Sequence, residues 1–247
     1  MKVAENLMVD IPTLCNGDYI TKARSILRDD VFRELYVLDE KNRLAGYLDI
    51  SDVLRVVDTK SNVTIEGFVR EAARVAPDTP LTGVGRAIMN ARTNSAAVVD
   101  EDGVFLGGVL FSELIPILIS RRDICGRVKD AMSPEPVTCA PEDPIHRIYN
   151  LIIASGFIAF PVVQKSEPIG IVSRRDLLRA GSIRMSVKNQ ADTTVDRVMT
   201  TPVITVTPDD PVATAAHLMV DHDVSILPVI DERKRIVGVI DRHDVSS

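Results

Sequence analysis

The stretch "GIVSRRDLL", residues 170–178, runs from a short apolar strand directly into a helix. Its isoleucine and valine favour a strand, and the spacing of Ser173 and Asp176 is that of a capping box at a helix N-terminus. Near copies recur as "GYLDISDVL" at residues 46–54 and as "GVIDRHDV" at residues 238–245. A pattern that returns along the chain predicts a repeated structural unit.

The repeat extends well beyond this stretch. Four windows of 24 residues align without a gap, beginning at Asn16, Pro77, Pro141 and Pro208. A glycine follows each window, and an acidic residue lies six positions beyond each glycine, at Asp52, Glu113, Asp176 and Asp244. These acids are 61, 63 and 68 residues apart. Each repeat is therefore small for an independent core, and we expect the repeats to pack in pairs.

Each repeat is predicted to have the element order β-α-β-β-α. A short extended piece, such as residues 202–206, leads to an Asp-Pro step, so that Asp143 and Asp210 are the predicted N-caps of the following helices. Apolar residues then recur at helical spacing, and two short apolar strands joined by a polar turn follow. The second helix begins at the Ser-x-x-Asp box.

The repeat pattern also predicts the domain organisation. It lapses at the predicted linkers, which are residues 58–63, 120–126 and 181–194. The predicted repeats are residues 1–58, 62–122, 123–182 and 192–247. The fold class is therefore α/β (α+β), with four β-α-β-β-α repeats arranged as two pairs.

Composition excludes several classes of function. A net charge of −6 and an aromatic content of 4%, with no tryptophan, argue against nucleic acid as a partner. Three cysteines form no C-x-x-C motif and no disulfide framework. The start of the chain lacks an apolar signal core, and no run of eighteen apolar residues occurs. The sequence predicts a cytoplasmic protein that binds neither nucleic acid nor membrane.

Further shared columns define the repeat more closely. A short segment that ends in methionine lies upstream of the windows, as in "VKDAM" from Val128 and "VDRVM" from Val195. A threonine lies three positions before the window in three repeats, at Thr13, Thr138 and Thr205. Together with the Pro-Val strand and the Gly…Ser-x-x-Asp junction, this pattern resembles the CBS domain, which is named after cystathionine β-synthase.

The resemblance covers nearly the whole chain and carries functional implications. Two tandem CBS domains form a pseudo-twofold pair, the Bateman module, so four repeats imply two modules, as in the gamma subunit of AMP-activated protein kinase and in stand-alone prokaryotic proteins. The implied function is regulatory and non-catalytic, with AMP, ADP, ATP or another adenosyl ligand bound between paired repeats, mainly in the second module. The resemblance also implies a homodimer formed through the modules and an unidentified regulated protein as partners.

The Ser-x-x-Asp box has two interpretations. As a capping box it only starts a helix. As a ligand site, its carboxylate can accept hydrogen bonds from both hydroxyls of a ribose, and the N–H groups and dipole of the helix start favour phosphate. The third repeat is predicted to hold the best-formed site and the fourth the next. The second repeat carries Leu110 and Glu113 in this box and is predicted to be degenerate.

The resemblance extends the ligand site to the threonine columns, to the strand that contains Pro-Val and to the arginines beside the box. The predicted ligand-binding residues are Thr138, Cys139, Ile158, Ala159, Phe160, Pro161, Ser173, Arg174, Arg175, Asp176, Thr205, Ser225, Ile226, Leu227, Pro228, Asp241, Arg242 and Asp244. The weaker candidates are Thr13, Arg33 and Asp52. The prolines suggest an unpaired strand edge. The first module has Tyr36 and Ala97 in their place, which makes its sites poorer.

The basic residue that meets phosphate in the kinase subunit is matched here only by Arg33. A nucleotide site in the second module would therefore take its phosphate charge from the arginines after Ser173 and Asp241. If these arginines point to solvent, a ligand of lower negative charge such as S-adenosylmethionine is favoured.

An enzyme needs a catalytic constellation, and the sequence supplies none. The four histidines have no metal-ligand spacing, and neither a nucleophile elbow nor a Walker A loop occurs, so we predict no catalysis and no metal. Two alternatives stay open: a ligand-free module for protein interaction or oligomerisation, and a sensor of S-adenosylmethionine. Binding of an adenosyl compound separates the first alternative from the others.

Overall fold

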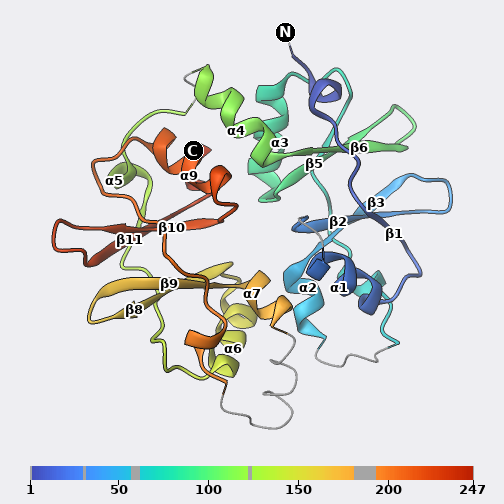
Figure 1. The fold of residues 1–247 in the computed structure, drawn as a ribbon. Coiled ribbons are helices and arrows are strands. Elements are labelled where there is room, and N and C mark those ends of the chain that lie inside the picture. The colour runs from blue at the N-terminus through green and yellow to red at the C-terminus, as the bar shows by residue number, and fades with distance from the viewer. Residues whose placement is uncertain (1, 30–31, 57–61, 122–123, 181–192, 247) are drawn as a thin grey trace. The chain divides into compact units, whose positions relative to one another are not determined.

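The computed structural model describes residues 2–29, 32–56, 62–121, 124–180 and 193–246. The chain divides into two compact units, Met1–Leu118 and Ile119–Ser247, whose elements Figure 1 labels. The boundary lies directly before the predicted linker at residues 120–126. The linkers predicted at residues 58–63 and 181–194 lie mostly outside the described residues.

The first unit contains two three-stranded sheets with their helices. Its first repeat consists of the 3-10 helix η1 (Ala4–Leu7), β1 (Thr13–Cys15), α1 (Ile20–Asp29), β2 (Glu34–Leu38), β3 (Leu44–Asp49) and α2 (Ile50–Arg55). Its second repeat consists of η2 (Glu66–Phe68), β4 (Arg74–Val75), α3 (Leu81–Ala91), β5 (Ser95–Val99), β6 (Phe105–Leu110) and α4 (Phe111–Ser120). In each sheet the middle strand is parallel to the first strand and antiparallel to the third.

The second unit has the same helices and hairpins, but one of its sheets has three strands and the other has two. Its first repeat consists of α5 (Val128–Ala131), β7 (Ser133–Pro134), α6 (Ile145–Ser155), β8 (Ala159–Gln164), β9 (Glu167–Ser173) and α7 (Arg174–Arg179). Its second repeat consists of η3 (Val195–Arg197), α9 (Val212–Asp221), β10 (Ile226–Ile230), β11 (Ile236–Asp241) and η4 (Asp244–Ser246). The hairpins β8–β9 and β10–β11 are antiparallel (Figure 1).

The cores lie where the helices face these hairpins. The helical positions expected from the sequence are the buried ones, which in α6 are Ile145, Ile148, Tyr149 and Ile152 and in α9 are Val212, Ala215, Ala216 and Met219. The mixed α/β fold class is therefore confirmed.

The start of these two helices differs from the prediction. Asp143 and Asp210 were predicted as N-caps, and this was wrong, because the N-cap positions are Pro144 and Pro211. The Asp143 carboxylate accepts the N–H of the residue three positions earlier at 2.8 Å, and Asp210 does the same at 2.6 Å. Each aspartate thus closes the turn that precedes the helix.

Proline shortens the first strands of the second unit. In the first unit the Ala97 N–H donates to the carbonyl of Ala73 at 2.8 Å and ties β4 to β5. Pro161 and Pro228 occupy the same column and have no N–H to donate. The preceding extended segments therefore pair through the isolated bridges Cys139–Val162 and Val206–Val229.

The two repeats of each unit exchange a segment of chain. The residues after the first short helix of one repeat pair antiparallel with the third strand of the other repeat. In the first unit Arg70 pairs with Tyr47 of β3 and Val9 pairs with Gly108 of β6. In the second unit Thr200 pairs with Ile171 of β9, and Ser133 of β7 pairs with Val239 of β11. Each repeat therefore completes the sheet of its partner.

This exchange explains the glycine that recurs in the sequence. A Cβ atom at Gly46 would lie 2.3 Å from the carbonyl oxygen of Arg70, and one at Gly170 would lie 2.9 Å from the sulfur of Met199. The same position in the other two repeats, Gly107 and Gly238, is covered by Met8 and Met132. In three of the four repeats, the recurring methionine of one repeat thus packs on the recurring glycine of its partner repeat, where a side chain would not fit.

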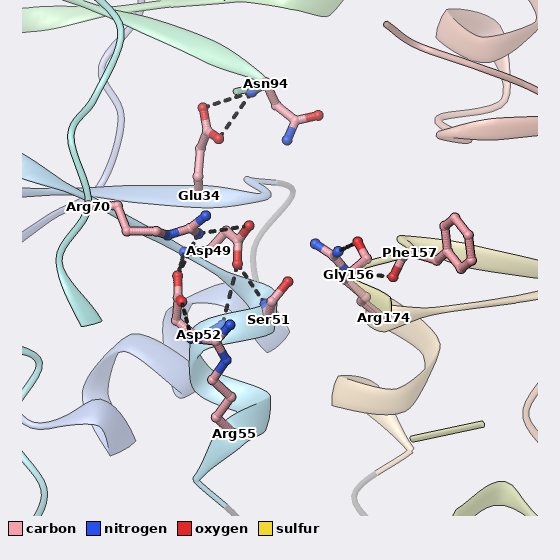
Figure 2. A network of polar contacts seen from close by, with 10 residues as sticks. All are labelled: Glu34, Asp49, Ser51, Asp52, Arg55, Arg70, Asn94, Gly156, Phe157 and Arg174. Atoms are coloured by element: carbon pink, nitrogen blue, oxygen red, sulfur yellow. Dashed lines mark hydrogen bonds and ion pairs between the residues drawn. The ribbon is translucent and has the colours of Figure 1, made fainter. Parts of the chain in front are cut away.

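A buried carboxyl also joins the two repeats of the first unit. The Asn94 N–H donates to both oxygens of Glu34, at 3.1 and 3.0 Å (Figure 2). The Ser95 hydroxyl also donates to Glu34. The Tyr36 hydroxyl lies 2.6 Å from the Ser95 oxygen. Burial raises the pKa of Glu34 to about 7, although the hydrogen bonds from Ser95 and Asn94 oppose the rise.

Candidate functional site

The box of the third repeat joins β9 to α7. Ser173 is the N-cap of α7, and its hydroxyl accepts the Asp176 N–H at 3.3 Å. In return the Asp176 carboxylate accepts from the Ser173 N–H at 2.8 Å and from the Ser173 hydroxyl at 2.6 Å. The predicted capping box is confirmed, and it fixes the carboxylate at the junction of strand and helix.

A residue of the fourth repeat reaches the same carboxylate. The Thr200 hydroxyl donates to the second Asp176 oxygen at 3.1 Å, because the exchanged segment places Thr200 beside Ile171. Among the described residues, the three donors to this carboxylate are neutral and no cation forms an ion pair with it. An ionised carboxylate offers about four acceptor positions, so Asp176 retains capacity for a further donor. Thr200 is not among the predicted ligand-binding residues, and its signal in the sequence is a hydroxyl residue directly after the recurring methionine, Met199.

The box of the fourth repeat has the same form with an aspartate as the cap. Asp241 accepts the N–H groups of His243 and Asp244 at 2.7 and 3.0 Å, and Asp244 accepts the Asp241 N–H at 2.8 Å. Ser133 of the partner repeat occupies the position that Thr200 has in the third repeat. Two acidic residues therefore stand where the third repeat has a serine and one aspartate.

Both carboxylates of the box in the first repeat form ion pairs within the protein. Arg70, from the second repeat, forms ion pairs with Asp52 at 2.6 Å and with Asp49 at 3.0 Å (Figure 2). Its guanidinium lies over the Tyr47 ring, 4.6 Å from the ring centroid. Burial and the charge of Asp49 raise the pKa of Asp52, and Arg70 opposes the rise. Arg70 occupies the position of Thr200, so a guanidinium replaces a hydroxyl on the carboxylate.

The box of the second repeat lacks a polar cap. Leu110 ends β6, α4 begins at Phe111, and the Glu113 side chain is exposed. Val9 lies at the exchanged position and offers no donor from its side chain. The four boxes therefore differ in chemistry although they share one backbone design.

The arginines beside the boxes bind protein acceptors. Arg174 donates to the carbonyls of Phe157, at 2.9 Å, and Gly156 (Figure 2). Arg175 and Arg242 both donate to the carboxylate of Asp223, at 2.7 and 3.3 Å. Their predicted contact with a ligand phosphate stays a prediction.

The structure links the other predicted residues to the boxes only in part. The carbonyls of Ile158 and Ser225 accept the N–H groups of Arg174 and Arg242, at 3.0 and 3.2 Å, so the strand start lies beside the box in both repeats. Thr138 and Thr205 are half-buried and directly precede the single bridging residues Cys139 and Val206. The remaining strand residues are half-buried or buried, and these are Ala159, Phe160, Pro161, Ile226, Leu227 and Pro228. Of the weaker candidates, Thr13 lies in β1 and Arg33 is half-buried before β2.

The thiol of Cys139 gives a direct test of this region. Burial, with the charge of Asp143, raises the pKa of Cys139 to about 12, whereas Cys15 and Cys125 are exposed. Because the thiolate is the reactive form, we expect iodoacetamide at pH 8 to modify Cys139 at least about a hundredfold more slowly than the exposed pair. Mass spectrometry of tryptic peptides measures the rates, and urea-unfolded protein is the control. Equal rates in the folded protein would contradict the burial of Cys139.

Among the described residues, no group of three or more His, Cys, Asp or Glu side chains is placed to hold a metal ion. No helix in the described parts of the chain is both long and apolar enough to span a bilayer.

The chain matches the model of a known protein family. The CBS domain model matches residues 4–59, 128–183 and 195–247, which is about two thirds of the chain. Protein MJ1225 of Methanocaldococcus jannaschii is 22% identical over 272 residues, which span 99% of this chain and 96% of that protein. The crystal structure of MJ1225, which has been proposed as an archaeal homologue of g-AMPK, covers 99% of both chains with a TM-score of 0.85 at 18% identity.

Two further likenesses cover only about half of the chain. Homoserine O-acetyltransferase of Methanosalsum zhilinae is 31% identical over 120 residues, which are 48% of this chain and 23% of that enzyme. The CBS domain pair of MJ0100, crystallised with 5′-methylthioadenosine and S-adenosyl-L-methionine, is 28% identical over 49% of this chain, with a TM-score of 0.42. The similarity to an enzyme is thus confined to a part of the enzyme about the size of one unit.

Proposed function

Because the chain belongs to the CBS domain family, we propose that it is a regulatory, non-catalytic protein that binds an adenosyl ligand in its second unit. The ligand is an adenine nucleotide (AMP, ADP or ATP) or, as the second candidate, S-adenosylmethionine. The observation that carries the proposal is the Asp176 carboxylate, which neutral donors of two repeats hold at a strand–helix junction. We extend the proposal to a cytoplasmic location, to a homodimer and to a regulated partner protein.

The chemistry of this carboxylate suits a ribose. A vicinal diol offers two hydroxyl donors, and an ionised carboxylate has acceptor positions only. Ser173 and Thr200 fix the orientation of Asp176 before a ligand arrives, so little ordering remains to oppose binding. Hydrogen bonds to a charged acceptor are roughly twice as strong as neutral ones.

The same carboxylate couples the two repeats. Ser173 belongs to the third repeat and Thr200 to the fourth, so a ligand on Asp176 binds the paired form of the unit. A ligand that binds only this form stabilises it by mass action, by about 2.7 kcal/mol at a hundred times its Kd. The regulatory signal in this proposal is the increased stability of the pair.

The first unit has a different role in the proposal. Arg70 already forms ion pairs with both carboxylates of its first box, and Leu110 replaces the cap in its second. We therefore assign ligand binding to the second unit and a scaffold role to the first.

Calorimetric titration with adenosine, AMP, ADP, ATP and S-adenosylmethionine tests the proposal. We expect at least one of these ligands to bind, and Asp176→Asn to weaken its binding at least about tenfold, because charge-assisted bonds to the ribose are lost. Glu113→Gln alters the same column of the second repeat and is the matched control, with unchanged affinity expected. Circular dichroism verifies that both variants are folded.

Failure of the proposal has a clear form. If ligand-free protein binds none of the five compounds, the box of the third repeat is a helix cap only. The interaction module then becomes the leading function. Binding that Asp176→Asn leaves unchanged would move the site away from this box.

A further inference from the structure

A buried carboxyl group joins the two hairpins of the first unit. Glu34 begins β2 of the first repeat, and Ser95 begins β5 of the second repeat. Glu34 is 4% exposed and Ser95 is 1% exposed, so water has little access to the contact between them. The carboxyl accepts the N–H of Asn94 (Figure 2) and the hydroxyl of Ser95. One side chain therefore holds together the starts of two strands that belong to different repeats.

Tyr36 extends the same contact. Its hydroxyl lies 2.6 Å from the Ser95 oxygen. The centroid of its ring lies 5.1 Å from that of Phe105, on β6 of the second repeat. When Glu34 is protonated, its O–H can donate to Ser95, and the Ser95 hydroxyl can donate to Tyr36. The contact is then a chain of neutral hydrogen bonds inside the protein.

The surroundings of Glu34 oppose a negative charge. Asp49 lies opposite Glu34 in the register of β2 and β3. Arg70 forms its ion pairs with Asp49 and Asp52, and among the described residues no cation forms an ion pair with Glu34. Burial and the charge of Asp49 raise the pKa of Glu34 to about 7, against the opposing hydrogen bonds. The carboxyl therefore changes its charge near neutral pH.

The two tyrosines that face Glu34 stay neutral in this range. Burial raises the pKa of Tyr47, on β3, to about 12, and it raises the pKa of Tyr36 well above its ordinary value. The facing end of β5 presents an amide N–H and a hydroxyl, which do not titrate. The remaining charged groups pair with one another and are Asp49 on β3, Asp52 on α2 and Arg70. The proton on Glu34 therefore decides whether the contact between β2 and β5 carries a charge.

The second unit has no equivalent group. Ala159 begins β8 and Ile226 begins β10, at the positions that Glu34 and Ser95 occupy in the first unit. Neither of these apolar side chains can carry a charge. The chain therefore contains one pair of repeats with a titratable contact and one pair without it, and the second pair is an internal reference.

We propose that Glu34 is a proton-operated latch between the two repeats of the first unit. When the carboxyl is protonated it is neutral, and the contact between β2 and β5 is closed. When the carboxyl is ionised, its charge requires solvation, and the starts of the two strands separate to admit water. The only group exchanged is a proton, which passes between the carboxyl and the solvent. The latch does not depend on the ligand proposed for the second unit.

Linkage gives the direction of the pH dependence. The carboxyl binds its proton more tightly in the closed contact than in water, so low pH favours the closed contact. Opening releases one proton as long as the closed form is protonated and the open form is ionised. The equilibrium constant for opening is therefore expected to rise about tenfold per pH unit between about pH 5 and 7, and to level off at higher pH.

Hydrogen exchange of the full-length protein, measured by mass spectrometry from pH 5 to 8.5 and corrected for the intrinsic exchange rate, tests the latch. In the native protein the opening constant of β2 and β5 should rise with pH as described. It should stay constant in Glu34→Gln and in Glu34→Ser, which copies the residue at the start of β5. Glu40→Gln, at an exposed position after β2, is the matched control and should behave like the native protein. The strands β8 and β10 of the second unit should show no change in opening constant.

Two results would overturn the latch. At pH 8 we expect β2 and β5 to open at least about tenfold more often than the helices α1 and α3 of the same unit. Equal opening constants would mean that the strands are exposed only when the whole unit unfolds. Infrared spectroscopy at pH 6 reports on the proton itself, because a protonated carboxyl has its own carbonyl band, which should lose intensity in Glu34→Gln. An unchanged band would mean that Glu34 is already ionised in the closed contact. Either result leaves the proposed ligand site of the second unit standing, since calorimetric titration decides that site separately.

Discussion

Replacing Gly46 with alanine is expected to lower the free energy of unfolding of the first unit by about 3 kcal/mol or more. The new Cβ would lie 2.3 Å from the carbonyl oxygen of Arg70 and 2.6 Å from a methyl group of Val69. The backbone of the exchanged segment must move, and the two hydrogen bonds of 2.9 Å between Tyr47 and Arg70 lengthen with it. Contact between the repeats is then lost at its centre.

The tyrosines provide the measurement. Three of the four, Tyr19, Tyr36 and Tyr47, lie in the first unit, and the chain has no tryptophan, so tyrosine fluorescence in urea reports mainly on this unit. Gly67→Ala is the matched control, because nothing lies within 4 Å of a Cβ built there. We expect the control to change the free energy of unfolding by less than about 1 kcal/mol. Equal urea midpoints for the two variants would refute the proposed role of Gly46.

The second large effect concerns the buried carboxyl of Glu34. Its pKa is about 7 in the folded protein, against an ordinary value of 4.5, so the folded state binds the proton more tightly than the unfolded state. The first unit is therefore most stable below about pH 4.5 with respect to this group, and loses stability as the pH rises to 7 and above. A shift of this size corresponds to about 3 kcal/mol in the free energy of unfolding.

Glu34→Gln isolates this contribution. The amide is neutral at every pH, so we expect the variant to lack this decline, and to be more stable than the native protein at pH 8 by up to about 3 kcal/mol. Urea unfolding at pH 5, 6, 7 and 8, followed by tyrosine fluorescence, gives the difference. Glu40→Gln, at an exposed position, is the control and should follow the native protein. Parallel pH profiles for native protein and Glu34→Gln would show that Glu34 is ionised without cost.

The repeat and its local structure could be predicted from the sequence because they depend on neighbours in the chain. The spacing of Ser173 and Asp176 predicted the capping box that the structure shows. Apolar periodicity predicted the four buried positions of α6, from Ile145 to Ile152. The N-caps were misplaced by one residue because Pro144 is extended, at φ −69° and ψ 135°, and Asp143 bonds backward instead of forward.

Contacts between repeats could not be predicted in the same way. Thr200 and Arg70 reach the boxes of their partners through strand pairing across 29 and 23 residues, which no local period encodes. The first-unit segment around Arg70 also matches the methionine column poorly, so its alignment with Thr200 follows only from the register with Tyr47 and Ile171. Asp223, which accepts from the buried Arg175 and Arg242, likewise has no signal in the sequence beyond its position in the repeat, which is that of Gly156 in the third repeat.

The exchanged segments also limit how such a chain can change in length over evolution. In each unit, the last strand of each repeat pairs with a segment of the partner repeat. Removing one repeat would therefore leave the other with an exposed strand edge and an exposed glycine. A gene that gains or loses this module therefore has to do so two repeats at a time. A single repeat would have to take its missing strand from a second copy of itself. Such a repeat would therefore be stable only as a dimer.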